Sequence, residues 1–317
     1  MSFTARKTAA IVNPKSADGR TGRVWPEIER RLTQRLGHVT VRFTERAGHG
    51  IELTRELLAQ GFGLIIGAGG DGTFNEIANG FIARDELVRP GACMGILPAG
   101  TGGDFRRMFG FASPRGIDLA LETLATGRPE MIDVGKVRYL SHTGQPSERY
   151  FVNLVSFGMG GAVAAGARNF LTPLGGQFAF FWSTFCVLLG YRGKRVQLSV
   201  DGGEPAIYRV TNVAVGNGQF HGGGMRPCPA AAMNDGILEV TVIEYMNMLQ
   251  LLRDIRVLYS GEIYRHPKVR SLRGTRIDAK GQGAVLIEVD GEPLGRLPVD
   301  ISVLPARMPV MCSSRNE

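Results

Sequence analysis

Short apolar runs alternate with longer amphipathic stretches up to about residue 136. Apolar residues fill the runs Thr8–Val12, Leu64–Ile66 and Met94–Leu97, which predict buried strands. Between these runs, apolar residues recur at helical spacing from about Gly22 to Leu36 and from His49 to Gln60. Strands that alternate with helices are typical of a parallel sheet covered on both faces.

Beyond Ile132 the apolar positions follow a two-residue period, which predicts short β-strands. The segments with this period are 196–200, 207–215, 238–243, 285–289 and 299–304. Regularly spaced strands with glycine turns favour an antiparallel sandwich or a barrel-like domain.

The two patterns predict an α/β plus β fold, with an N-terminal Rossmann-like parallel-sheet domain and a C-terminal antiparallel β-sandwich domain. The first domain is expected at residues 1–136, with the C-terminal tail 305–317 as a candidate addition, and the second at 137–304. The boundary is expected near Gly135 to Pro146.

A polar turn follows each of the three N-terminal apolar runs. Asn13–Ser16 follows the first, Gly69–Thr73 the second and Pro98–Asp104 the third. Glycines let backbone N–H groups approach an anion, and a helix N-terminus favours negative charge. Because ligands of open α/β sheets bind outside the carboxyl ends of the strands, we expect the three turns to converge on one nucleotide site.

Asp71 distinguishes the second turn from better-known phosphate loops. Gly67–Gly72 satisfies the dinucleotide pattern G-x-G-x-x-G, but that site also needs an acidic residue at the end of the next strand to bind the ribose. The only candidates, Asp85 and Glu86, precede the next apolar run. The turn is not a Walker loop either, because no Gly-Lys-Ser/Thr follows it. A carboxylate beside a polyphosphate is repulsive unless a divalent cation bridges the two or the carboxylate takes a proton. The turn therefore indicates phosphoryl transfer. The alternative is a tight turn in which Asp71 is simply exposed.

Composition excludes some classes of site. The four cysteines form no C-x-x-C pair and the five histidines form no H-E-x-x-H arrangement, so neither a zinc site nor a disulfide framework is expected. The net charge of +8 favours nucleotide phosphates, anionic bilayers or nucleic acid without choosing among them. Met1–Pro14 lacks a secretory signal pattern, so a cytoplasmic location is expected.

Residues 178–189 form the richest apolar segment of the chain, with five aromatic residues between glycines. The segment is shorter than the roughly 20 residues that span a bilayer. A helix that is apolar all round belongs to a core, or its aromatics could line a cleft for acyl chains.

A second acidic motif, Val289–Pro293, lies between alternating apolar runs. Asp290-Gly291 is a strong hairpin signal, whereas no turn needs Glu292-Pro293. A carboxylate on a hairpin can accept the proton of an attacking hydroxyl group. Asn234–Ile237 is first of all a turn before a strand.

These motifs together resemble the diacylglycerol kinase catalytic family, which includes bacterial soluble lipid kinases and sphingosine and ceramide kinases and is distantly related to NAD kinase. The resemblance is carried, in family order, by Val12–Ser16, Thr44–His49, Gly69–Asn75, Leu97–Phe105, Ile132–Gly135, Val215–Gly218, Gly222–Gly224, Asn234–Leu238 and Val289–Pro293. Gly103 departs from the pattern, because the family usually carries Asn before this aspartate.

The resemblance implies an ATP site, a catalytic base and a Mg²⁺ site. The implied ATP-site residues are Asn13, Pro14, Lys15, Ser16, Thr44, Gly69, Gly70, Asp71, Gly72, Thr73, Asn75, Gly100 and Thr101. Glu292 would be the proton acceptor with Asp290 beside it, and Asp71 is the competing candidate. Mg²⁺ would be held by the Asp235 carboxylate and the carbonyls of Ala232 and Ile237.

We therefore expect an ATP- and Mg²⁺-dependent lipid kinase that phosphorylates a diacylglycerol-like lipid. The alternatives are an NAD kinase and a non-catalytic nucleotide-binding regulator of the same fold. The expected lipid comes from the inner membrane surface, with which the enzyme would associate peripherally from the cytoplasm; a homodimer is allowed, and no nucleic-acid partner is expected.

Overall fold

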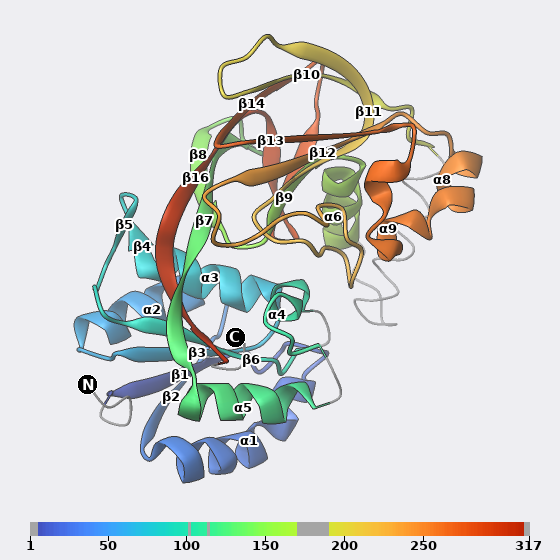
Figure 1. Ribbon diagram of the computed structural model, residues 1–317. Helices are drawn as coiled ribbons and strands as arrows, with labels where there is room; N and C mark the ends of the chain where they lie inside the picture. The colour runs from blue at the N-terminus through green and yellow to red at the C-terminus, as the bar shows by residue number, and fades with distance from the viewer. Residues whose placement is uncertain (1–5, 101–102, 113–114, 170–189, 314–317) are drawn as a thin grey trace. The chain divides into compact units, whose positions relative to one another are not determined.

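The computed structural model describes residues 6–100, 103–112, 115–169 and 190–313 of a mixed α/β chain (Figure 1). The chain divides into two compact units, which we call unit 1 (Met1–Asp133 with Ala306–Glu317) and unit 2 (Val134–Pro305). Two long strands, β7 (Arg128–Ser141) and β16 (Glu292–Cys312), contribute residues to both units.

Unit 1 alternates strands and helices along the chain. Its further elements are β1 (Thr8–Val12), α1 (Arg20–Leu36), β2 (Val39–Phe43), α2 (His49–Ala59), β3 (Leu64–Ala68), α3 (Asp71–Phe81), β4 (Ile82–Ala83), β5 (Glu86–Leu87), β6 (Cys93–Leu97), α4 (Asp104–Arg107) and α5 (Gly116–Thr126). The predicted strands and the two predicted helices of this region are confirmed, with α1 beginning two residues earlier than expected.

The sheet of unit 1 has the order β2-β1-β3-β6, and these neighbours pair in parallel. Every residue of β1, β3 and β6 is buried because helices cover both faces. Trp25, Leu32 and Leu121 of α1 and α5 pack on one face, whereas α2 and α3 lie on the other (Figure 1). The end of β16 joins the edge of this sheet, with Val310 parallel to Met94.

Unit 2 is mostly antiparallel β-structure. Its further elements are β8 (Pro146–Phe151), β9 (Leu154–Gly158), α6 (Met159–Asn169), β10 (Lys194–Val200), β11 (Ala206–Gly216), β12 (Leu238–Glu244), α8 (Met248–Asp254), α9 (Val257–Ser260), η2 (Ile263–Arg265), β13 (Val269–Gly274), β14 (Arg276–Gly281) and β15 (Leu286–Val289). The segments predicted from the two-residue period fall in strands, except that Val285 lies one residue before β15, which confirms the antiparallel, sandwich-like domain.

The core of unit 2 is built from alternating β-branched and aromatic residues. Phe157 of β9, Val213 of β11 and Ile287 of β15 are fully buried in it. Strand β9 pairs with both β11 and β15, so it joins the hairpin of β15 and β16 to β11. A smaller apolar cluster lies where α8, α9 and η2 pack against β12 and β13.

In the part of the chain that the structure describes, no helix is long and apolar enough to cross a membrane. The aromatic segment 178–189, with its two expected roles, lies outside the described residues.

Candidate functional site

The loops after β1 and β3 meet where the strand order reverses. Strand β2 pairs on one side of β1 and β3 on the other, which makes this the switch point at which open α/β sheets bind ligands. The Asn13 N–H donates to the Ala68 carbonyl at 3.0 Å. Asn13 Nδ2 also lies 3.4 Å from Thr73 Oγ1, so the two polar turns are joined as expected.

The loop after β6 reaches the same place. The Gly100 N–H donates to the Gly69 carbonyl at 3.1 Å, and a Cβ at Gly100 would lie only 2.9 Å from that oxygen. A Cβ at Gly69 would collide with Thr73 Oγ1. In contrast, a Cβ at Gly70 would meet nothing within 4 Å, so this turn is tightly packed at Gly69 and Gly100 and open at Gly70.

The loop after β1 is fixed by its own polar side chains. Asn13 Oδ1 accepts the Lys15 N–H at 3.1 Å, and Ser16 Oγ donates to the Asn13 carbonyl at 2.9 Å. Thr21 Oγ1 donates to the Ala99 carbonyl at 2.9 Å and joins this loop to the loop after β6. The Lys15 side chain remains exposed, which leaves a cation beside the three turns.

The other expected nucleotide residues surround these turns. Pro14 accepts the Gly22 N–H at 3.2 Å, the buried Thr44 donates its N–H to the Val12 carbonyl at 2.9 Å, and Gly72 lies in the first turn of α3. Asn75 is buried in α3, where it accepts hydrogen bonds from Asn79. Thr101 lies outside the described residues.

Asp71 binds main-chain amides. Its Oδ2 accepts the N–H groups of Gly103 (3.0 Å) and Asp104 (3.1 Å), and its Oδ1 accepts that of Phe105 (2.9 Å). These amides begin the short helix α4, so Asp71 fastens the loop after β6 to the glycine turn. Three such donors use most of the acceptor sites of the Asp71 carboxylate. An exposed turn residue would make none of these bonds.

Gly103 has a backbone conformation that suits glycine. Its φ is 126°, and a Cβ there would collide with Arg106 Nε. Asn at this position, as in the related pattern, would need a different local backbone.

In unit 2, Asp290 is held in the same manner as Asp71. The φ angles of Asp290 (47°) and Gly291 (86°) are both positive, which fits the expected hairpin turn. The Asp290 carboxylate accepts the N–H groups of Val152 (2.9 Å), Asn153 (3.1 Å) and Leu154 (2.8 Å). Asp290 is buried. Its hydrogen bonds join the hairpin turn to the start of β9.

Glu292, the first residue of β16, is more accessible. Its side chain is 36% exposed, and Oε2 lies 3.5 Å from Arg149 of β8, whose side chain is 17% exposed. Burial raises the pKa of nearby Tyr139, an effect that Arg149 opposes and Glu292 reinforces. The sequence did not reveal Arg149 or Tyr139, because their pairing with Glu292 depends on strands far apart in the chain.

Glu288 is a second acidic residue beneath the hairpin that sequence reasoning missed. Its side chain is 1% exposed; Oε2 accepts the Gly291 N–H at 2.8 Å, and Oε1 lies 3.2 Å from His221 Nε2. The loop that carries His221 is held in turn by Asn153, whose Nδ2 donates to the Phe220 carbonyl at 2.6 Å. A carboxylate in an alternating strand is the only signal that the sequence offers here, and it is a weak one.

The residues expected to bind Mg²⁺ lie around the turn that carries Asp235. Asp235 Oδ1 accepts the Ile237 N–H at 3.1 Å, and Oδ2 binds Arg273 at 2.8 Å. Ala232 is half-buried two residues before the turn that carries Asp235. The Arg273 guanidinium lies between two carboxylates, since its Nε is also 3.1 Å from Glu239 Oε2, so in this arrangement Asp235 faces an arginine. Across the described ranges, no group of three or more His, Cys, Asp or Glu side chains is placed to hold a metal ion.

Two family descriptions match the chain. Residues 7–137 match the diacylglycerol kinase catalytic domain, and residues 153–312 match the YegS C-terminal NAD kinase beta sandwich-like domain.

Similar proteins cover nearly the whole chain. A protein named diacylglycerol kinase from Staphylococcus saprophyticus is 28% identical over 92% of this chain and 91% of its own length. A protein named probable lipid kinase YegS-like, from Chromohalobacter salexigens, is 30% identical over 90% of this chain and 86% of its own length.

Solved structures share the fold. A putative diacylglycerol kinase from Bacillus anthracis has a TM-score of 0.77 at 22% identity, covering 98% of this chain and 96% of the other. A yeast NADH kinase complexed with NADH has a TM-score of 0.54 at 13% identity, covering 98% and 84%.

Proposed function

The chain belongs to the diacylglycerol kinase family of lipid kinases, and we propose that it transfers the γ-phosphate of ATP to the hydroxyl group of a diacylglycerol-like lipid. Unit 1 would serve as a Rossmann-like nucleotide-binding domain, and unit 2 would supply the proton acceptor for the lipid. The lipid would come from a membrane surface.

The observation that carries the nucleotide assignment is the convergence of three loops at the switch point of unit 1. The loops after β1, β3 and β6 are joined by the hydrogen bonds of Asn13, Gly100 and Asp71. We propose that the polyphosphate lies over Gly70 at the N-terminus of α3, where the backbone is open and the helix dipole favours an anion. Lys15 would add a positive charge, with the remaining predicted ATP-site residues around it.

We propose that Glu292 is the general base. Asp71 and Asp290 each accept three amide hydrogen bonds, so protonating either one would break part of the structure it holds. Glu292 is accessible, and Arg149 lies 3.5 Å from its carboxylate, where it orients the side chain. In the reaction, the lipid hydroxyl oxygen bonds to the γ-phosphorus, the bond to the β-phosphate oxygen breaks, ADP leaves, and the proton passes to Glu292.

Mg²⁺ is proposed as the ion that accompanies ATP and neutralises charge on the polyphosphate. The Asp235 turn would hold this ion only after its carboxylate released Arg273. Positioning and charge would provide most of the catalysis, since phosphoryl transfer requires little covalent chemistry from the protein.

A direct test is phosphate transfer from ATP with Mg²⁺ to separate acceptors: a short-chain diacylglycerol, ceramide, sphingosine and NAD. We expect the diacylglycerol to be phosphorylated and NAD to remain unchanged. Product from NAD alone would identify an NAD kinase. ATP binding without turnover on any acceptor would identify a regulator that has lost catalysis.

A further inference from the structure

The outward side of α8 and α9 carries a stripe of exposed apolar residues. Leu249, Leu252, Ile255 and Tyr259, which we call the apolar stripe, are 75%, 51%, 45% and 51% exposed. Spacings of three and four residues place them on one side of a helix. Ile255 and Arg256, between α8 and α9, keep right-handed helical backbone angles, so the stripe runs along one nearly continuous ridge.

The inward side of the same ridge is already packed. Leu251, Val257 and Leu258 contact the small core formed by residues of β12, β13, η2 and the loop before α8. The apolar stripe is therefore additional to what this core requires. Clustered exposed apolar side chains, unlike single ones, mark interaction sites.

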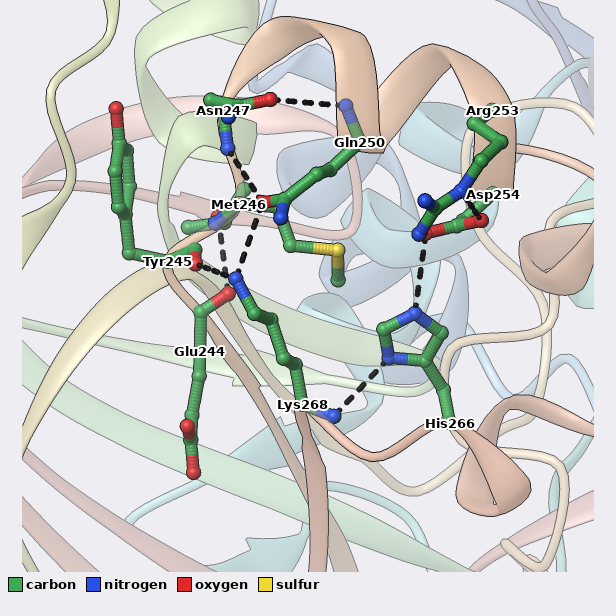
Figure 2. A network of polar contacts seen from close by, with 10 residues as sticks. Glu244, Tyr245, Met246, Asn247, Gln250, Arg253, Asp254, His266 and Lys268 are labelled. Carbon is green, nitrogen blue, oxygen red and sulfur yellow. Dashed lines mark hydrogen bonds and ion pairs between the residues drawn. The ribbon is translucent and has the colours of Figure 1, made fainter.

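A polar network holds α8 in one orientation (Figure 2). Asn247 and Gln250 form a capping box at its start, and Lys268 Nζ donates to Gln250 Oε1 at 3.0 Å. At its end, Asp254 binds Arg253 at 2.8 Å and lies 3.3 Å from His266. These contacts fix which side of the short helix faces outward.

Positive charge surrounds the apolar stripe. Residues 247–270 contain five Lys or Arg residues and two acidic ones. Arg253 (71% exposed side chain), Arg256 and Arg265 (81%) are exposed on or beside the ridge; Arg253 also pairs with Asp254, and Arg265 pairs with Glu262. Apolar residues flanked by arginines are the composition of surfaces that lie in the interface of an anionic bilayer.

We propose that the ridge of α8 and α9 is the membrane-docking surface of this enzyme. The apolar stripe inserts at the boundary between headgroups and acyl chains, while the neighbouring arginines bind lipid phosphates. This inference rests on the proposed use of a membrane lipid, and it adds where and how the enzyme meets the bilayer.

The test is flotation with vesicles of phosphatidylcholine alone and with roughly one third phosphatidylglycerol. Wild-type protein is expected to float with the anionic vesicles and to dissociate as salt rises. The double variant Leu249→Ser, Leu252→Ser should lose roughly tenfold or more in vesicle affinity, because the two apolar side chains that the bilayer would bury are removed. Arg256→Gln with Arg265→Gln should weaken binding to anionic vesicles and flatten its salt dependence.

The matched control is Ile207→Thr, which alters a 65% exposed aliphatic residue of β11 in the same unit. It should bind vesicles like the wild type. Circular dichroism establishes that every variant is folded, and the arginine pair tests the surface without altering the leucines. Unchanged flotation of both the leucine and arginine variants would overturn the proposal, as would a wild-type dimer that the leucine variant converts to a monomer in sedimentation velocity.

A soluble short-chain diacylglycerol separates docking from catalysis. Stripe variants should phosphorylate it at the wild-type rate and lose activity only on vesicle-borne lipid. If vesicle binding depends on the apolar stripe but no lipid is phosphorylated, the proposed function is wrong and the docking surface is supported. Phosphorylation with stripe-independent binding would do the reverse.

Discussion

Asp71 and Asp290 have the same hydrogen-bonding role. Each lies in a glycine-containing turn, and each accepts three main-chain hydrogen bonds from a separate loop, 103–105 for Asp71 and 152–154 for Asp290. Glu292, two residues after Asp290, is partly exposed and contacts Arg149. The sequence could identify all three carboxylates as candidates for the base, but only tertiary hydrogen bonds distinguish residues that hold loops from one that can accept a proton.

Asp290→Asn is expected to destabilise the protein. The amide group can still accept hydrogen bonds through one oxygen, but its NH₂ group would face a main-chain N–H, leaving a buried donor unsatisfied. Such a group costs about 1–3 kcal/mol. Denaturant unfolding should show this loss, with Glu292→Gln as the control that changes stability by much less; equal stability of Asp290→Asn and wild type would contradict the assigned contacts.

The glycine turn offers a matched pair of substitutions. Gly69→Ala should destabilise unit 1 by about 1–3 kcal/mol, because its methyl group would overlap Thr73. Gly70→Ala should leave stability nearly unchanged, since φ is −101° and no atom lies near its Cβ, but it should weaken ATP binding where the polyphosphate needs that space. Calorimetric titration with ATP and thermal unfolding measure the two effects. Normal ATP affinity in Gly70→Ala would show that the polyphosphate does not bind over this turn.

At the scale of elements, periodicity predicted β1, β3, β6, α1 and α2 in unit 1 and β10, β11, β12, β15 and part of β16 in unit 2, but it did not predict β2, β8, β9, β13 or β14. It worked because each element buries one face or both. It did not predict that β16 continues for 21 residues from the Glu292 hairpin to the sheet of unit 1, since that path is set by pairing partners distant in sequence. It also missed α8 and α9, whose inward side contacts only a small core.

The pH dependence of α8 follows from Asp254. Its hydrogen bond to Arg253, assisted by His266, lowers the pKa from 3.8 to about 2. A carboxyl group with a lowered pKa in the folded state stabilises folding above its unfolded pKa and loses that effect as the pH falls. The destabilisation caused by Asp254→Asn should therefore be constant above about pH 5 and shrink between about pH 4 and pH 2. Denaturant titrations at several pH values test this, and a difference that grows on acidification would contradict it.

At the scale of the whole molecule, unit 1 needs the C-terminal end of the chain. Met308, Val310 and Met311 are buried, and the Ala306 N–H donates to Asp133 at 2.7 Å. Deleting 306–317 should cost several kcal/mol of unit 1 stability, because each buried side chain contributes about 1.5–3 kcal/mol. Hydrogen exchange should show faster exchange in β6, the strand that pairs with Val310, than in β12 of unit 2. Unchanged protection of β6 would mean that the tail is dispensable.

The most direct measurement of the central claim is kcat for lipid phosphorylation across pH in wild type, Glu292→Gln and Asp290→Asn, each corrected for its folded fraction. Glutamine keeps the size and hydrogen-bonding ability of Glu292 but cannot accept the lipid proton. The account predicts that Glu292→Gln loses roughly 10²-fold or more in kcat with little change in the KM for ATP, and that folded Asp290→Asn loses much less. Near-full kcat in Glu292→Gln, with activity abolished in Asp290→Asn or in a parallel Asp71→Asn enzyme, would contradict it and assign the base elsewhere.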